Sequence, residues 1–347
     1  MLRFILGGAG SGKSTRLTER IAKDVTNRHP AWLIIPEQQA NLSERTMLPK
    51  LPTAAGLTFS ITGFSRLCDQ VTARFGGRPI TPLQGGLCSL LMWQNLREMS
   101  GLLTEYNTAS PRSDANLTLL LLQTIDELRA DAITPAMLEG AANRLPETAA
   151  LRPKLYDLAL LYAAYDNSIA EAFDGARYDA VAHLAELLSR HDYFAGGHVY
   201  IDSFTSFTAE EYDVLRHILR QAKEVTVTLC LDETLTTQPS HESPLDTYRR
   251  LLRLCEEEHV SVECETLTQN HRTAKPELQI LERSLWDLSK TAESLDLPDE
   301  AERGAITLLR CSNVYAEVEA TALHVLDLVH QGYRFGDIAV VVRDAES

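Results

Sequence analysis

The first residues that could do chemistry form a glycine-rich loop close to the start of the chain. The loop and the residue after it are Gly7, Gly8, Ala9, Gly10, Ser11, Gly12, Lys13, Ser14 and Thr15. The run fits the pattern G-x-x-x-x-G-K-[ST], in which backbone N–H groups surround a phosphate group. The lysine of this pattern binds the β- and γ-phosphates, and the hydroxyl binds Mg²⁺. The loop therefore predicts a site for the phosphates of a nucleotide such as ATP, with Ser14 as a magnesium ligand.

A second candidate is Asp202, which ends the apolar run Val199-Tyr200-Ile201. A carboxylate in this position can reach the same Mg²⁺ through water. The alternative is that Asp202 caps the helix that follows it. In an active nucleotide-driven motor the next residue is a glutamate that polarises the attacking water, but here it is Ser203, whose hydroxyl is no general base at neutral pH. We therefore expect nucleotide binding with slow hydrolysis.

These residues need a sheet to bring them together, and the apolar pattern predicts one. Strand-like runs lie at residues 2–6, 32–35, 57–61, 198–202 and 225–229. Helical spacing of apolar residues follows the glycine loop over 14–26 and recurs over 209–221. Strands separated by helices predict a parallel sheet, so the expected fold class is α/β.

The pattern changes between residues 81 and 190, where Leu- and Ala-rich segments such as 117–128 and 155–173 replace strand-like runs. We predict a helical insertion domain over 81–190. The first nucleotide-binding domain is expected to consist of 1–80 and 191–270. Residues 271–347 are expected to form a linker and the beginning of a second α/β domain.

The second domain is predicted from two apolar runs, 305–309 and 338–342, which are buried-strand candidates on either side of a helix over 316–331. The acidic stretch 289–303 predicts an exposed linker before them. The sequence stops at 344–347, soon after the second run. Since a sheet is seldom left half built, we expect this sequence to be part of a longer protein.

Composition limits the class of protein. The chain has 347 residues, 33 Lys and Arg against 48 Asp and Glu, a net charge of −15 and 44% hydrophobic residues, values of a soluble globular protein. No apolar run approaches the ~20 residues that span a bilayer, and the glycine loop interrupts any signal peptide, so we expect a cytoplasmic protein without membrane contact. The six cysteines form no C-x-x-C pair, which argues against a metal cluster or disulfide framework and favours mostly buried thiols.

The motifs together resemble those of the UvrD-like superfamily 1 helicases. The glycine loop, Pro36-Glu37-Gln38 with Glu44, and the run 58–67 are similar to the first helicase motifs. The run 202–208, Asp-Ser-Phe-Thr-Ser-Phe-Thr, narrows the resemblance to the B subunits of AddAB-type helicase–nucleases. The runs 267–273 and 332–344 are similar to a fourth motif and to the start of a second motor domain.

This resemblance implies a P-loop NTPase fold of the RecA-like type and a role in processing DNA double-strand breaks. It implies ATP and Mg²⁺ at Lys13, Ser14 and Asp202, with Arg272 approaching the γ-phosphate; the alternative for Arg272 is a solvated arginine at a helix start. The implied partners are an AddA-type motor and nuclease subunit, DNA ends and single-stranded DNA. An iron–sulfur cluster is implied only for a C-terminal nuclease domain that this sequence lacks.

Two departures from the family pattern weaken the expected motor. Ser203 replaces the glutamate, and residues 231–235 lack the glutamine of the third motif. We therefore expect this fragment to hydrolyse ATP poorly and to have no nuclease activity. Two alternatives stay open: a freestanding P-loop enzyme such as a small-molecule kinase, and a non-hydrolysing scaffold subunit.

Contact with single-stranded DNA is predicted at Phe59, Phe64 and Arg66, in the segment where such helicases meet the strand. Aromatic rings can stack on bases, and arginine can contact phosphate. The alternative is that the two phenylalanines belong to the hydrophobic core.

Overall fold

The computed structural model describes residues 1–52, 58–76, 85–106, 111–172, 180–231, 242–272, 275–284 and 305–342. The chain divides into two compact units, Met1–Arg272 and Thr273–Ser347. The sequence predicts the end of the first nucleotide-binding domain at residue 270 and the start of the linker and second domain at residue 271. The helical insertion lies inside the first unit.

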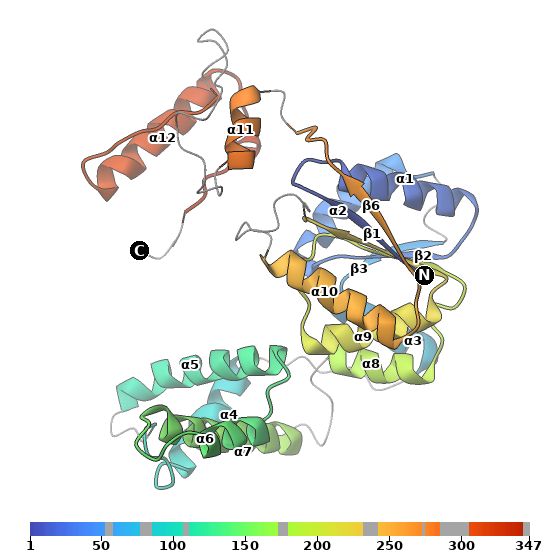
Figure 1. Ribbon diagram of the computed structural model, residues 1–347. Helices are drawn as coiled ribbons and strands as arrows, with labels where there is room; N and C mark the ends of the chain where they lie inside the picture. The colour runs from blue at the N-terminus through green and yellow to red at the C-terminus, as the bar shows by residue number, and fades with distance from the viewer. Residues whose placement is uncertain are drawn as a thin grey trace. The chain divides into compact units, whose positions relative to one another are not determined.

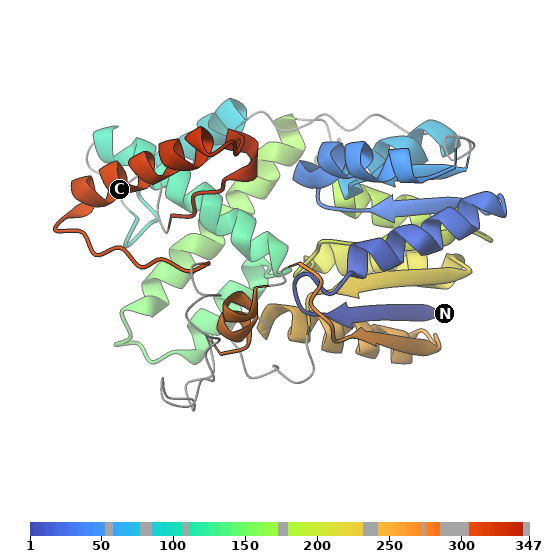
Figure 2. The same cartoon turned by 90° about the horizontal axis from the view of Figure 1, so that it is seen from above.

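The first unit contains a six-stranded parallel sheet in the order β3-β2-β4-β5-β1-β6. Its strands are β1 Leu2–Gly7, β2 Ala31–Ile34, β3 Phe59–Thr62, β4 His198–Ile201, β5 Glu224–Leu229 and β6 Val262–Leu267. The strand arrows point the same way in Figure 2. The predicted α/β class and parallel sheet are confirmed, and the five strands predicted between residues 2 and 229 occur within a residue or two of their expected positions. The edge strand β6 was not predicted.

Alternating side chains of β1 explain how both faces of the sheet are buried. Leu2, Phe4 and Leu6 enter one core, and Ile5 enters the other. Helices α1 (Lys13–Thr26) and α2 (Ala40–Met47) cover the Ile5 face. The opposite face is covered by α3 Phe64–Phe75, α8 Ala180–Arg190, α9 Ala209–Gln221 and α10 Glu242–Glu257. Figure 1 shows these two helical layers on either side of the strands.

The insertion has a hydrophobic core of its own. Its helices are α4 Gly85–Glu98, α5 Pro111–Ala130, α6 Pro135–Arg144 and α7 Leu151–Ala172. Buried Asp157 of α7 accepts hydrogen bonds from the backbone N–H groups of Thr104, Glu105 and Tyr106, which holds this segment after α4 against α7. Helix α8 lies within the predicted insertion 81–190 but belongs elsewhere, because Leu184, Leu187 and Leu188 pack in the core of the sheet.

The second unit contains α11 (Pro276–Ser284), α12 (Val314–His330) and a short 3₁₀ turn (Phe335–Asp337). The predicted helix at 316–331 is therefore confirmed. The strands predicted at 305–309 and 338–342 are wrong for the part of the chain described, because both segments are irregular and all their residues except half-buried Ile338 are exposed. Leu308 is 94% exposed and Val341 is 92% exposed. An apolar run becomes a strand only when a neighbour completes its hydrogen bonds, and the described residues of this unit offer none.

Some sequence predictions lie outside the described residues. They are Leu57 of the third strand, the third-motif segment 232–235, the linker 289–303 and the final residues 344–347. Within the described part of the chain, no helix is both long and apolar enough to cross a membrane.

The cysteines correct one expectation. Of the six, only Cys68 and Cys255 are buried, while Cys88 and Cys311 are partly buried and Cys230 and Cys264 are exposed. Burial raises the pKa of the Cys255 thiol to about 11, so this side chain behaves as a small apolar group.

Candidate functional site

The glycine loop connects the carboxyl end of β1 to the amino end of α1. Gly10 and Gly12 have φ values of +79° and +90°, in the left-handed region that favours glycine. Gly12 is the residue just before α1, so the first N–H groups of the helix face the loop. The local sequence thus gives a tight turn next to a helix amino terminus, an arrangement suited to an anion.

The ammonium group of Lys13 lies inside this loop. It donates hydrogen bonds to the carbonyl oxygens of Gly7 and Gly8, at 2.8 and 2.7 Å. The hydroxyl oxygen of Ser11 is buried without a hydrogen-bond partner. The loop therefore places a positive charge and an unused polar atom where the sequence predicted a phosphate.

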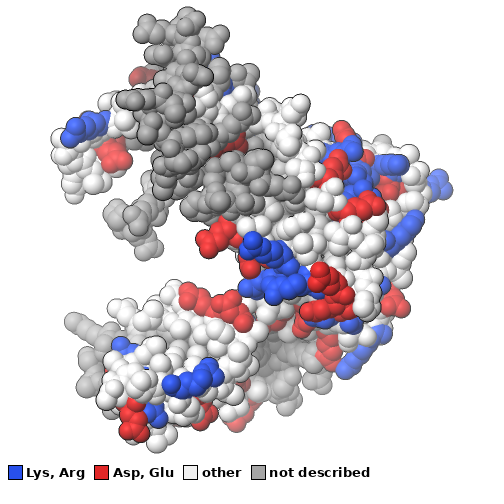
Figure 3. Space-filling view, in the orientation of Figure 1, with Lys and Arg blue, Asp and Glu red and all other residues white. Residues whose placement is uncertain are grey.

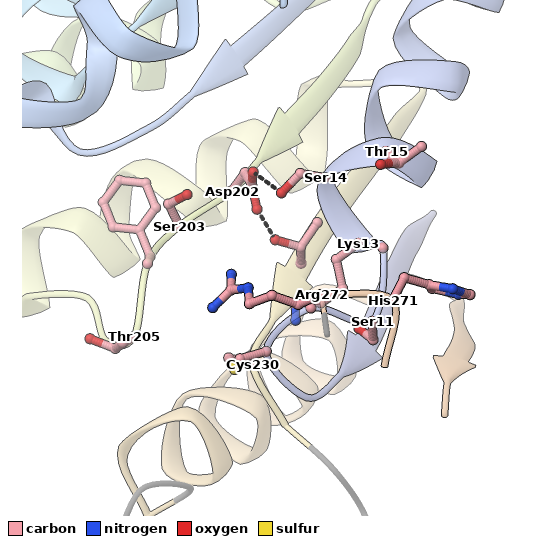
Figure 4. A pocket seen from close by; sticks show the side chains of 15 residues that line it. Ser11, Lys13, Ser14, Thr15, Asp202, Ser203, Thr205, Cys230, His271 and Arg272 are labelled. Carbon is pink, nitrogen blue, oxygen red and sulfur yellow. Dashed lines mark hydrogen bonds between the residues drawn. The ribbon is translucent and has the colours of Figure 1, made fainter. Parts of the chain in front are cut away.

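Asp202 follows β4 directly and lies beside the start of α1. Its Oδ2 is 3.4 Å from the hydroxyl oxygen of Ser14, and the hydroxyl of Thr228 on β5 donates to its Oδ1. Both contacts are drawn in Figure 4. The capping alternative is wrong, because α9 is capped by Thr208 in a capping box with Glu211.

The segment after β6 closes the other side of the loop. The backbone N–H of His271 donates to the carbonyl oxygen of Gly10 at 2.8 Å. Arg272 follows, and its own N–H donates to the side-chain oxygen of Asn270 at 2.8 Å. A Cβ on Gly10 would lie 2.6 Å from the Cβ of Arg272, so glycine is required for this close approach. The candidate Arg272 is therefore held against the glycine loop.

These elements enclose a cavity of about 520 Å³. Its lining contains the candidates Ala9, Gly10, Ser11, Gly12, Lys13, Ser14, Thr15, Asp202 and Arg272. Gly7 and Gly8 contribute through their carbonyl contacts with Lys13. In Figure 4 the Arg272 side chain extends toward the side of Asp202 and Ser203, and His271 points away from it. The candidates far apart in sequence thus meet in one place.

The lining also contains Phe204, Thr205 and His271, which belong to the quoted motif runs but were not predicted as site residues, and Thr228 and Cys230, which no motif included. Thr228 and Cys230 come from the end of β5, which lies between β4 and β1 in the sheet. Only the strand order brings them to the cavity, so no local pattern could have identified them.

Ser203 lines the cavity in an unusual backbone conformation. Its φ is +69°, a left-handed value that is uncommon for any residue with a side chain. Strained residues of this kind gather at binding and catalytic sites. The serine is exposed at the cavity, and no carboxylate stands at this position.

The segment predicted to contact DNA is divided between core and surface. Phe64 is 5% exposed and packs edge-on against Phe204, with the ring centroids 5.7 Å apart. Phe59 is partly buried against the opposite core. Phe64 therefore belongs to the core, as the alternative held. Arg66 is exposed, and its Nη1 lies 3.2 Å from Oε1 of Glu44.

Fold and site together define a class. This is a parallel α/β protein whose cavity lies at the carboxyl ends of the strands, beside a glycine loop and a helix amino terminus, where open α/β sheets bind their ligands. The chain belongs to the family described as ADDB, N-terminal, whose model matches residues 4–282.

Similar proteins carry one name. The B subunit of the ATP-dependent helicase/deoxyribonuclease of Acetivibrio thermocellus is 28% identical over 350 residues, which cover 98% of this chain and 30% of that protein. The proteins of the same name from Thermoanaerobacter sp. and Bacillus cereus are 28% and 27% identical, over 99% and 100% of this chain. The chain spans 30% of the length of each of these relatives.

Proposed function

We propose that the cavity binds MgATP. The observation that carries this proposal is the 3.4 Å approach of Asp202 to Ser14, which joins the two predicted magnesium ligands across 188 residues of sequence. A hydroxyl and a carboxylate are oxygen ligands, which Mg²⁺ prefers. On this proposal Ser14 holds the ion directly, and Asp202 holds it through water.

The phosphates would lie in the glycine loop. Lys13 is placed to exchange its carbonyl contacts for the β- and γ-phosphates, and the N–H groups at the start of α1 add further donors. The buried hydroxyl of Ser11 would gain a partner in the same step. Arg272 is proposed to contact the γ-phosphate, because it lines the same cavity and is held to Gly10 through its neighbour His271.

Hydrolysis is proposed to be slow. Ser203 follows Asp202, and its short hydroxyl side chain cannot act as a general base at neutral pH as a glutamate would. The bound nucleotide would then act mainly as a ligand that orders the glycine loop and the Arg272 segment. A non-hydrolysing scaffold is the second candidate, and the same absence of a base from position 203 favours it.

We further propose that this chain is the ATP-binding, RecA-like amino-terminal region of the B subunit of a bacterial helicase–nuclease for double-strand-break repair. The support is family membership and the printed names of the relatives, which are B subunits of an ATP-dependent helicase/deoxyribonuclease. An AddA-type motor and nuclease subunit is the proposed partner, and DNA ends are the proposed substrate.

The charge distribution limits how DNA could be held. Figure 3 has Lys and Arg side chains next to Asp and Glu side chains on the face that it presents. Arg216 pairs with Glu257 at 3.1 Å, and Arg250 pairs with Asp246 at 2.7 Å. These pairs argue against a broad basic surface, so single-stranded DNA is proposed to bind through a few local contacts. Arg66 is one candidate, and it would exchange its pairing with Glu44 for a phosphate.

The test is an equilibrium titration of the chain with MgATP. Lys13→Ala should weaken binding at least tenfold, because charge-assisted contacts are worth about 1.5–3 kcal/mol. Lys23→Ala is the matched control, since Lys23 is exposed near the other end of α1. Equal affinity of the wild type and Lys13→Ala would refute the site. Two results together would favour the non-hydrolysing scaffold. The affinity for MgATP would be the same with and without single-stranded DNA, and the assembly would show no ATP turnover.

A further inference from the structure

A second polar cluster lies at the amino ends of the strands, at the edge of the sheet opposite the glycine loop. Asp24 belongs to the last turn of α1, and His29 lies in the turn that leads to β2. His198 is the first residue of β4, and Tyr200 follows two positions later. Because all strands are parallel, this cluster is separate from the cavity at their carboxyl ends.

One carboxylate is the centre of the cluster. Nδ1 of His198 is 2.5 Å from Oδ2 of Asp24, and Nδ1 of His29 is 3.5 Å from Oδ1. The hydroxyl of Tyr200 also donates to Oδ2. One potential ligand atom from each of Asp24, His29 and His198 lies within 4.8 Å of the others. Two imidazoles and a carboxylate thus converge from three separate elements.

Burial makes this arrangement more than a surface cluster. Asp24 and His198 are each 9% exposed. Burial and the hydrogen bond to Asp24 raise the pKa of Tyr200, so this phenol remains a donor. These hydrogen bonds satisfy the carboxylate, but Nδ1 of His29, which faces it, is buried without a hydrogen-bond partner. A network of hydrogen bonds alone therefore does not account for the His29 imidazole.

We propose that Asp24, His29 and His198 bind one divalent transition-metal ion, of which Zn²⁺ is the best match. Zinc accepts imidazole nitrogen and carboxylate oxygen at about 2.0–2.2 Å, which places neighbouring ligand atoms about 3.3–3.6 Å apart in a tetrahedral site. The separation of 3.5 Å between His29 and Asp24 already fits this range. The contact of 2.5 Å between His198 and Asp24 must open by about 1 Å, so the ion replaces that hydrogen bond.

The remaining features of the cluster agree with this assignment. The side chain of His29 is 40% exposed, which gives the ion a path from solvent and leaves space for a water ligand. Tyr200 continues to donate to Asp24, as second-layer partners of metal ligands do. Mg²⁺ is excluded as the natural occupant because it prefers oxygen ligands.

Such an ion would fasten α1 at its far end. The helix begins in the glycine loop and carries Asp24 in its last turn, while the two histidines precede β2 and begin β4. Binding would join the end of α1 to the starts of two central strands. The site is therefore structural, and its test does not depend on nucleotide binding.

The experiment is a Zn²⁺ titration of the chelator-treated chain in competition with a chromophoric chelator. We expect one Zn²⁺ per chain and a raised unfolding temperature. His29→Ala should weaken the affinity at least about tenfold, since even outer partners of metal ligands contribute 10–100-fold. His324→Ala is the matched control, because His324 is an exposed helix residue in the other unit.

Cobalt substitution separates this site from the exposed thiols Cys230 and Cys264. Ligation by nitrogen and oxygen gives a d–d spectrum without a thiolate charge-transfer band. His29 is partly exposed, so its variants should fold, and His29→Asn provides a second test beside His29→Ala. Absence of stoichiometric Zn²⁺, unchanged affinity in both His29 variants, or a thiolate band from the bound cobalt would each overturn the proposal.

Discussion

The carboxylate of Asp202 lies 3.4 Å from the hydroxyl of Ser14, although 188 residues separate the two in the chain. They meet because β1 and β4 are parallel and end at the same edge of the sheet, with β5 between them. Thr228 on that intervening strand donates to the second oxygen of Asp202 and fixes its orientation. The sheet thus sets the geometry of the proposed magnesium site.

Thr228→Val tests this orientation. Valine has nearly the same shape but no hydroxyl, so Asp202 loses a donor while the core keeps its packing. We expect MgATP affinity to fall about fivefold, which corresponds to roughly 1 kcal/mol for one hydrogen bond. The measurement is the titration already described, with Mg²⁺ varied at fixed ATP. Thr26→Val is the control, since the Thr26 hydroxyl donates only to the carbonyl of Ala22 within α1; an equal loss in both variants would contradict a specific role.

Gly10→Ala should disturb the loop and the Arg272 segment together. Gly10 has a φ of +79°, and a Cβ there would lie 2.6 Å from the Cβ of Arg272. A left-handed conformation costs an L-residue about 1–2 kcal/mol, and the overlap adds to this. We expect a lower unfolding midpoint in urea and weaker MgATP binding. Gly140→Ala is the control, because Gly140 lies in α6 with open space around it. Alanine at this position should stabilise the folded protein by up to about 1 kcal/mol.

Slow hydrolysis is best measured in the proposed full-length subunit together with its proposed AddA-type partner, in a variant of that partner whose own ATP site is inactivated. A positioned general base contributes about 10²–10⁴-fold, and Ser203 supplies none. We expect turnover well below the roughly 1–10³ s⁻¹ of ordinary enzymes. If the assembly hydrolyses ATP at ordinary rates and Lys13→Ala abolishes this activity, the expectation is wrong. Ser203→Glu is informative only if it raises the rate, because residues 231–235 also lack the glutamine expected from the family resemblance.

Acid should weaken the contact between α9 and the end of α10. Glu258 accepts hydrogen bonds from Arg220 and Arg216, and these lower its pKa, Arg220 contributing most. A carboxyl with a lowered folded-state pKa adds stability above its ordinary value of about 4.3, and this is lost as pH falls through the folded-state pKa. Urea midpoints of the wild type should therefore fall below about pH 4 more steeply than those of Glu258→Gln. If the urea midpoints of the wild type and Glu258→Gln fall equally with pH, Glu258 does not contribute to the acid sensitivity.

How far the sequence predicted the structure depends on whether the signal was local. Leu2, Phe4 and Leu6 alternate with Ile5 in a short apolar run, and this run is β1. Lys13 and Ser14 were predicted from the glycine-loop pattern, and Asp202 was predicted because it ends another apolar run. Thr228 was not, because its place beside Asp202 follows from the order of strands, which no single segment encodes.

Strand β6 was missed for a related reason. It carries Glu263 and Glu265, which interrupt any apolar pattern. In the fold these charges are compensated by distant arginines: Arg16 and Arg20 pair with Glu265 at 2.7 and 2.9 Å. Charged residues at a sheet edge are ordinary once such partners exist, but the partners lie some 245 residues away.

The position of β1 has a consequence for synthesis on the ribosome. Its neighbours are β5 and β6, and Leu2 faces Val225 and Val262. At about 5–20 residues per second, the ribosome needs roughly 10–45 s to pass from the codon for Leu2 to the codon for Val225. Throughout that interval the nascent β1 has neither flanking strand, while the insertion helices can already form their own core. The glycine loop, which follows β1 directly, is therefore made long before it can reach its final shape.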